Sequence, residues 1–268
     1  MKNSDFNKLI KDIKANSPLI HCITNPISIN ECANAILSLG AKPIMAEHPE
    51  EAEEITKTCK ALMLNLGNIT DVRMKSMLIS AKTANSHNIP FIIDLVGIAC
   101  SSLRRRYAKN LLSDFSATVI KGNYSEINAL SNSDYHSCGV DSENLDINYM
   151  NKIAVDCALK HNAIILASGK TDIITDGKQL FHNKSGTKKL SSVTGTGCML
   201  GALCACFLSS DNSILSAIAA CAFLGICGEK AENDKGSYSF LHNLMDNLST
   251  ITDINNDLHM EEIIIKNE

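Results

Sequence analysis

Short apolar runs alternate with helical segments through the first two thirds of the chain, and most of these runs end in a glycine or a polar residue. Runs of this length, separated by segments of helical periodicity, are typical of strands that pair in parallel through crossover helices. The sequence therefore predicts an α/β fold, with a doubly wound, mostly parallel central sheet and helices on both faces. The predicted strands are 18–25, 41–45, 61–67, 90–97, 117–123 and 163–169.

The pattern changes at residues 172–182, where Asp176-Gly177 separates two alternating apolar runs. This arrangement predicts one antiparallel hairpin at the edge of the sheet. Pro49 and the acidic residues that follow it are expected in the first turn of a helix. The tail after Ile251 is polar, and Ile263–Ile265 fits either a short strand or a docking segment. Later helices are expected at 197–208, 214–228 and 237–248.

The polar stretch 131–146 is expected to be an exposed loop, so residues 1–268 are predicted to form a single domain. The net charge of −4 argues against nucleic acid or an anionic membrane as the main partner. The apolar runs are too short to span a membrane, and the N-terminal residues lack the continuous apolar stretch of a signal peptide.

Eleven cysteines are scattered through apolar segments. Their odd number and their placement favour free thiols over disulfides, which predicts a cytoplasmic protein. No Cys-x-x-Cys pair occurs, so no structural zinc site is expected. Most of these cysteines are predicted to be small apolar residues of the core.

Five side chains, four of them polar, lie at or near the carboxyl ends of predicted strands, and one sharp turn is expected beside them. Because the carboxyl ends of parallel strands meet at one edge of a doubly wound sheet, these groups are expected to line a common ligand site. The residues aligned in this way are Asn25, Met45, Asp94, Asn123, Ser168 and the turn at Gly195.

Gly195 and Gly197 directly precede an apolar helical run, with Cys198 one position further on. Glycines at a helix start let backbone N–H groups approach an anion, which predicts a phosphate or oxyanion site. Cys198 would then lie within reach of the reacting group. The local pattern alone fits equally well a glycine-rich helix start followed by a buried cysteine.

Five polar residues each allow two interpretations. An acid at the end of an apolar strand, Asp94, requires a partner, solvent or a metal. Asn123 and Glu126 fit a helix capping box, although Glu126 and Asp94 together could hold Mg²⁺ through water. Lys121 fits either a solvated surface lysine or a ligand of a nucleotide phosphate. His21 is expected to be a hydrogen-bonded core histidine rather than a catalytic base.

Several of these segments together resemble the hydroxyethylthiazole kinase family of the ribokinase-like superfamily. The resemblance runs in order through most of the chain, and its first and last segments are the most specific. Where most ribokinase-like enzymes carry a catalytic Asp, this chain has Cys198, as the thiazole kinases do. The segments are PLIHCITN (18–25), LGAKPIMA (39–46), LNLG (64–67), DLVG (94–97), KGNYSE (121–126) and VTGTGCML (193–200).

The resemblance implies phosphorylation of the primary hydroxyl of 4-methyl-5-(2-hydroxyethyl)thiazole by ATP, in a homotrimer with active sites between subunits. Phosphoryl transfer needs mainly positioning and charge stabilisation, so Cys198, beside Gly195 and Gly197, is expected to orient the alcohol more than deprotonate it. The implied site residues are Asn25, Met45 and Gly195 for the thiazole, Lys121, Asn123 and Ser168 for ATP, and Asp94 and Glu126 for Mg²⁺.

The chain departs from the family pattern at two positions. Leu95 replaces a proline that usually follows the strand-terminal Asp, which leaves the geometry of that loop open. Ser168 stands where Thr is common and keeps the hydroxyl. Three other functions remain open: kinase activity on another small alcohol such as a hydroxymethylpyrimidine, ATP-dependent dehydration of a hydrated nicotinamide nucleotide, and binding of a nucleotide or thiamine precursor without catalysis.

Overall fold

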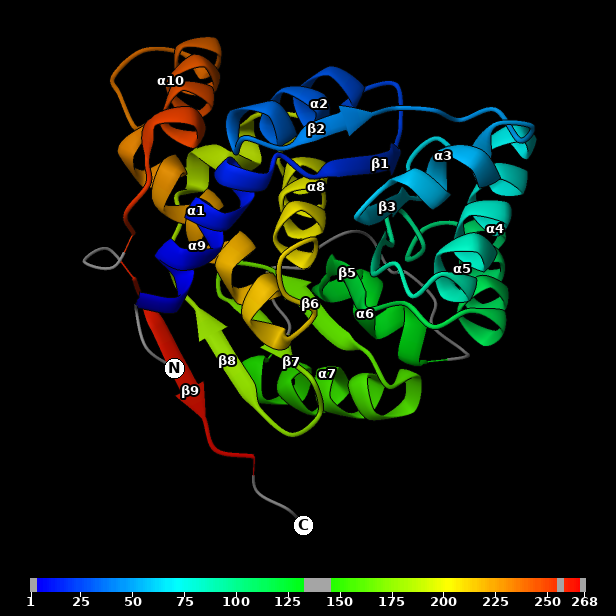
Figure 1. Ribbon diagram of the computed structural model, residues 1–268. Coiled ribbons are helices and arrows are strands. Elements are labelled where there is room, and N and C mark those ends of the chain that lie inside the picture. Colours follow the sequence, from blue (N-terminus) through cyan, green and yellow to red (C-terminus); the bar gives the residue numbers. More distant parts are fainter. Residues whose placement is uncertain (1–3, 133–145, 255–257, 266–268) are drawn as a thin grey trace.

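One mixed sheet runs through the computed structural model, which describes residues 4–132, 146–254 and 258–265. The described strands follow the order β2-β1-β3-β4-β5-β6-β7-β8-β9 (Figure 1). Six strands pair in parallel: β2 (Lys42–Ile44), β1 (Leu19–Ile23), β3 (Ala61–Asn65), β4 (Phe91–Asp94), β5 (Val119–Asn123) and β6 (Ile164–Ser168). The predicted mostly parallel sheet is therefore confirmed.

The predicted hairpin is also confirmed. Strands β7 (Asp172–Thr175) and β8 (Leu180–Asn183) pair in antiparallel fashion, and β7 joins the parallel part through β6. Strand β9 (Met260–Ile263) pairs in antiparallel fashion with β8. The tail therefore contributes a strand, which begins three residues before the Ile263–Ile265 segment singled out in the sequence.

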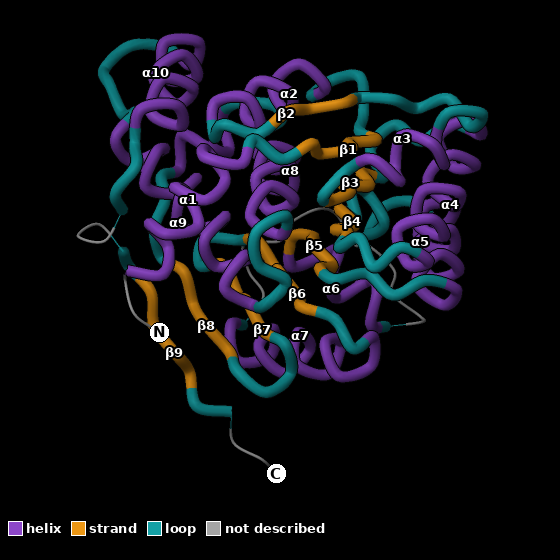
Figure 2. The backbone as a smooth tube through the Cα atoms, viewed as in Figure 1, coloured by secondary structure: helices purple, strands orange, loops and turns teal. Residues whose placement is uncertain are grey.

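Helices cover both faces of the sheet (Figure 2). Buried side chains of one face come from α1 (Ser4–Asn16), α2 (Ile29–Ser38), α8 (Thr196–Leu208), α9 (Ile214–Lys230) and α10 (Ser237–Thr250). Those of the opposite face come from α4 (Asp71–Ser86), α5 (Ser102–Asp114), α6 (Tyr124–Ser131) and α7 (Ile147–His161). Helix α3 (Ala52–Thr58) packs on α4, and a short 3₁₀ helix spans Lys188–Ser192.

The strand order reverses between β1 and β3, because the chain leaves β1 for β2 on one side and returns to β3 on the other. Ligands of doubly wound sheets bind outside the carboxyl ends of the strands at such a reversal. Helix α8 packs against β1, β3 and β4 at this point. The fold therefore brings the glycine-rich start of α8 to the place where a ligand is expected.

Two local predictions are refined by the structure. Helix α3 begins at Ala52, not at Pro49, because the N–H groups of Glu51 and Ala52 both donate to the carbonyl of His48 and close a turn there. All described cysteines except Cys100 and Cys198 are buried, which agrees with the prediction that most of the cysteines belong to the core. Most of the predicted loop 131–146 lies outside the described residues. No helix in the described part is long and apolar enough to cross a membrane.

Candidate active site

Three polar side chains lie opposite one another on adjacent strands. Asn65 of β3 pairs in register with Asp94 of β4, and Asp94 pairs in register with Lys121 of β5. Residues in register on parallel strands project from the same face of a sheet, which here is the face covered by α8. The sheet thus sets an amide, a carboxylate and an ammonium group side by side beneath α8.

Asp94 and Lys121 form a buried ion pair, with 2.9 Å between Oδ1 and Nζ and side chains 0% and 5% exposed. Burial raises the pKa of Asp94, and the Lys121 ammonium and the Asn65 amide oppose this rise. Burial alone would lower the pKa of Lys121, but the Asp94 carboxylate, its hydrogen bond to Lys121 and further nearby acidic groups together raise that pKa. Lys121 therefore carries its charge inside the protein, and the alternative of a solvated surface lysine is wrong.

Cys198 lies on the first turn of α8 and faces two amides of the sheet. Its Sγ accepts hydrogen bonds from Nδ2 of Asn25 and Nδ2 of Asn65, each at 3.3 Å. Oδ1 of Asn25 accepts from the N–H groups of Ile27 and Ser28, which fixes the loop after β1. Residues far apart in the sequence therefore converge on the Cys198 thiol.

The start of α8 is open. Its N-cap residue, Gly195, has φ of +94° and provides no side-chain cap. A side chain there would be strained by this φ, and its Cβ would lie 3.1 Å from Cβ of Ser28. A Cβ at Gly197 would lie 3.8 Å from Nζ of Lys121, so the buried ammonium sits directly below the first turn. An uncapped helix N-terminus above a cation is suited to an anion.

Asn123 and Glu126 form the capping box of α6. Oδ1 of Asn123 accepts from the Glu126 N–H at 2.9 Å, and Oε2 of Glu126 accepts from the Asn123 N–H at 2.8 Å. Oε1 of Glu126 also accepts from the N–H of Gly97 at 2.7 Å. Glu126 therefore joins the loop after β4 to the start of α6. Burial, and then the nearby Asp94 carboxylate, raises the pKa of Glu126.

The loop after β4 is fixed without the usual proline. The N–H of Leu95 donates to the Lys121 carbonyl at 2.9 Å, a hydrogen bond that a proline could not make, and the Leu95 side chain is fully buried. Arg104 donates to the carbonyl of Val96, and Arg105 donates to the carbonyls of Ile98 and Ala99. These bonds and Glu126 settle the loop geometry that the sequence left open.

Ser168 and Met45 complete the predicted set. Ser168 ends β6 in register with Asn123 of β5, and its hydroxyl donates to the Gly122 carbonyl at 3.4 Å. Met45 follows β2 and packs at the margin of the same core cluster as Cys198. Next to it, the carbonyl of Ala46 accepts a hydrogen bond from Nε2 of His21 at 2.8 Å. His21 is fully buried, so the prediction of a hydrogen-bonded core histidine is confirmed.

The donor set of Asp94 and Glu126 fits a magnesium ion held through water. Each carboxylate oxygen of these residues accepts one hydrogen bond and keeps a further lone pair. Within the described residues no group of three or more His, Cys, Asp or Glu side chains could hold a metal ion by itself. Mg²⁺ in phosphate sites commonly uses one or two carboxylates and completes its shell with water and phosphate oxygens.

Comparison with known proteins identifies the family. The model of the hydroxyethylthiazole kinase family matches residues 10–254. A relative from Clostridium botulinum strain Hall, hydroxyethylthiazole kinase 2, is 48% identical over 249 residues, which cover 91% of this chain and 94% of the relative. The chain belongs to the hydroxyethylthiazole kinase family. It is therefore a member of a kinase family, as the sequence motifs indicate.

Solved structures agree with this assignment to the hydroxyethylthiazole kinase family. A hydroxyethylthiazole kinase protein from Pyrococcus horikoshii OT3 superposes with a TM-score of 0.89 at 31% identity, over 97% of this chain and all of that one. A ribokinase-like superfamily protein from Enterococcus faecalis superposes with a TM-score of 0.61 at 14% identity, over 90% of this chain and 93% of that one. At that identity the second likeness concerns the fold alone, and the fold is ribokinase-like.

Asn65 is a polar residue of the candidate site that was not singled out from the sequence. It contacts Asn25, Asp94 and Cys198, and its side chain is fully buried. Its position was visible in the sequence as a polar residue near the end of an apolar run, which is the same signal that identified Asp94. Only the register of β3 and β4 shows that the two side chains meet.

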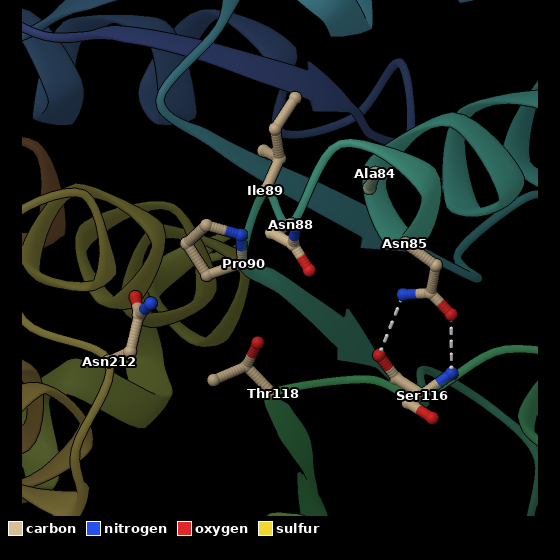
Figure 3. A pocket seen from close by; sticks show the side chains of 8 residues that line it. All are labelled: Ala84, Asn85, Asn88, Ile89, Pro90, Ser116, Thr118 and Asn212. Carbon is tan, nitrogen blue, oxygen red and sulfur yellow. Dashed lines mark hydrogen bonds between the residues drawn. The ribbon is translucent and has the colours of Figure 1, made fainter.

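A hollow of about 420 Å³ lies at the amino ends of β4 and β5, at the edge of the sheet opposite the candidate kinase site (Figure 3). Two of its lining residues are joined by hydrogen bonds: the Asn85 side chain donates to the carbonyl of Ser116 and accepts from the N–H of Ser116. None of the predicted site residues lines this hollow. Its lining residues are Ala84, Asn85, Asn88, Ile89, Pro90, Ser116, Thr118 and Asn212.

Proposed function

We propose that this protein transfers the γ-phosphoryl group of ATP to the primary hydroxyl of 4-methyl-5-(2-hydroxyethyl)thiazole, for thiamine biosynthesis. The observation that carries the proposal is the uncapped start of α8, with Cys198 on its first turn and Lys121 below it, in a chain of this kinase family. Phosphoryl transfer depends mainly on positioning and on stabilisation of charge. Backbone N–H groups at a helix start and a buried ammonium supply such stabilisation.

The two substrates are assigned to different parts of the site. Asn25, Met45 and Gly195 are assigned to the thiazole. Asn25 donates to Sγ of Cys198, Gly195 is the N-cap of the helix that carries Cys198, and Met45 follows β2 beside the strand-order reversal. The nucleotide phosphates are assigned to the neighbouring part of the edge, formed by the ends of β5 and β6. The residues of that part are Lys121, Asn123 and Ser168.

Cys198 orients the alcohol in this proposal. Two amide groups already donate to its Sγ, so the single S–H hydrogen is left to donate to the alcohol oxygen. An ordinary thiol is poorly matched to removing a proton from an alkanol, and a loose transition state requires little base catalysis. The hydroxyl is thereby aligned beside the helix start, where the phosphoryl group arrives.

Asp94 and Glu126 would hold Mg²⁺ through water molecules. When bound, the ion neutralises charge on the nucleotide phosphates. Asp94 also keeps the Lys121 ammonium in place, and Glu126 keeps the loop after β4 against α6. These two contacts are made by the protein whether or not the ion is bound.

The protein is also proposed to be a cytoplasmic homotrimer with its active sites between subunits. Apolar side chains at the start and on the outer side of α2 support a subunit contact next to Asn25: Ile27 is 58% exposed and Leu37 is 55% exposed. The free thiols of the described part support the cytoplasmic location. Light scattering after gel filtration tests the trimer, and a monomer at micromolar concentration contradicts it.

The direct test of the function is a product assay. The purified protein is incubated with Mg-ATP in three separate reactions. Each reaction contains one candidate substrate: the thiazole alcohol, a hydroxymethylpyrimidine or a hydrated nicotinamide nucleotide. ADP and the phosphorylated thiazole are the expected products. Phosphorylation of the pyrimidine alone, dehydration of the nucleotide, or binding without any product would each replace the proposal by the corresponding alternative.

A further inference from the structure

The amide of Asn65 uses its full hydrogen-bonding capacity inside the candidate site. Its Nδ2 donates to Oδ2 of Asp94 at 3.0 Å and to Sγ of Cys198 at 3.3 Å. Its Oδ1 accepts from the N–H of Gly67 at 2.8 Å and from Nδ2 of Asn25 at 3.2 Å. An amide has two donor hydrogens and two acceptor lone pairs, so no further partner is needed.

The orientation of this amide follows from its neighbours. The Gly67 N–H can only donate, so the atom it faces is the oxygen of Asn65. The nitrogen then faces Asp94, whose ionised carboxylate can only accept. Asn25 is oriented in the same way, because its oxygen accepts from the N–H groups of Ile27 and Ser28. The hydrogen bonds therefore run in one direction, from the loop after β1 through two amides to Asp94.

We propose that Asn65 is a positioning residue, which fixes the Cys198 thiol relative to the Asp94–Lys121 pair through its one amide group. The inference rests on the proposed function, in which Cys198 orients the alcohol and the Asp94–Lys121 pair lies beside the phosphates. Asn65 connects β3 to β4 and to α8, so it links the two halves of that site. A displacement of about 1 Å between reacting groups can reduce the rate by 10²-fold.

A purely structural role for Asn65 makes different predictions. A buried amide with satisfied hydrogen bonds also stabilises the fold, and its loss would lower the melting temperature. A structural role does not require that the reactivity of one thiol change, nor that the effect on turnover depend on Cys198. The tests therefore measure the reactivity of the Cys198 thiol and the dependence of the turnover effect on Cys198. The melting temperature of each variant reports any general loss of stability.

The first test measures the alkylation of Cys198 by iodoacetamide at pH 8, followed by mass spectrometry of the peptide that contains it. N–H donors stabilise the reacting thiolate, so Asn65→Leu is expected to slow alkylation by at least about threefold. The control is Asn85→Ala, which removes two amide hydrogen bonds to Ser116 at the opposite edge of the sheet (Figure 3). It is expected to react at the wild-type rate. An unchanged rate in Asn65→Leu overturns the proposal.

Asn65→Asp serves if the leucine variant does not fold, because it keeps the shape and the acceptor oxygen but loses the donor. The same slowing of alkylation is expected. Alkylation at the wild-type rate in folded Asn65→Asp overturns the proposal as well. Neither alkylation measurement requires that the protein be an active kinase.

The second test is a double-mutant cycle with Cys198→Ala in the thiazole kinase assay. Asn65→Leu is expected to lower kcat by at least about tenfold, with little change in the KM for ATP. In the Cys198→Ala background, the fold-decrease in kcat caused by Asn65→Leu should be at least about threefold smaller, because the thiol is no longer there to be positioned. Equal factors in both backgrounds overturn the proposal. If the wild-type protein phosphorylates no thiazole alcohol, the proposed function fails, and the alkylation test still decides the role of Asn65.

Discussion

Nζ of Lys121 lies 2.9 Å from Oδ1 of Asp94, and the pair is buried beneath α8. Removing one partner of a buried ion pair leaves the other charge without compensation. We expect Lys121→Met to lower the free energy of unfolding by about 3–5 kcal/mol and to abolish most of the turnover. Urea unfolding and ADP release measure the two effects.

The double variant Lys121→Met/Asp94→Asn separates charge balance from catalysis. Buried ion pairs replaced by neutral side chains often restore stability, so we expect most of the lost unfolding free energy to return while turnover stays low. A double variant as unstable as Lys121→Met would contradict the assignment of the penalty to an uncompensated Asp94.

Gly67 lies against the amide pair of Asn25 and Asn65. A Cβ at this position would be 2.8 Å from Nδ2 of Asn25 and 2.9 Å from Oδ1 of Asn65. We expect Gly67→Ala to displace these amides, to raise the KM for the thiazole alcohol severalfold, and to cost about 1–3 kcal/mol of stability. Gly236→Ala is the matched control, because nothing lies within 4 Å of its Cβ. Equal kinetics of the two variants would argue against the close contact at Gly67.

Much of the fold was predictable from the sequence, because buried parallel strands appear as short apolar runs and the helices between them show helical periodicity of apolar residues. Strand β3 begins at the predicted Ala61, and β5 ends at the predicted Asn123. The start of α3 was not predicted, because a turn at His48–Glu51 and a helical first turn have similar compositions. The placement of the tail strand was uncertain, since β9 forms only by pairing with β8, far away in the sequence.

The candidate site was predictable at the strand ends and at the glycine-rich turn, because special backbone geometry and polar residues after apolar runs are local features. The burial of Lys121 and the contacts of Asn65 were not, because both depend on the register between strands and on the position of α8. Glu126 illustrates the same limit. Its capping box is encoded locally, whereas its bond to the N–H of Gly97 is a long-range contact.

His21 makes the stability of the fold sensitive to acid. Burial lowers its pKa below 6.5, and its Nε2 donates to the Ala46 carbonyl next to Met45. Because the unfolded chain binds the proton more readily, stability is lost as the pH falls below about 6.5. We expect His21→Gln to make the fall in unfolding free energy between pH 7 and pH 5 shallower than in the wild type. Parallel curves in urea titrations across this range would contradict the prediction.

Glu126 is expected to affect the magnesium requirement. Its carboxylate lies near Asp94, and the amide of Glu126→Gln offers one acceptor oxygen in place of two. The magnesium concentration for half-maximal activity should rise severalfold at saturating ATP. Glu53→Gln is the control, because Glu53 is exposed and paired with Lys57 on α3. An unchanged magnesium titration in Glu126→Gln would remove this residue from the proposed metal site.

The role assigned to Cys198 predicts a moderate effect of its removal. A general base typically contributes 10²–10⁴-fold to the rate, whereas a group that only orients the alcohol contributes less. We therefore expect Cys198→Ala to keep a kcat within about 10²-fold of the wild type, with a higher KM for the thiazole alcohol. Steady-state assays that vary each substrate separate the two effects. A loss of kcat beyond this range in a folded variant would identify the thiol as the base, because Asn25, Asn65 and Lys121 would still hold the rest of the site in place.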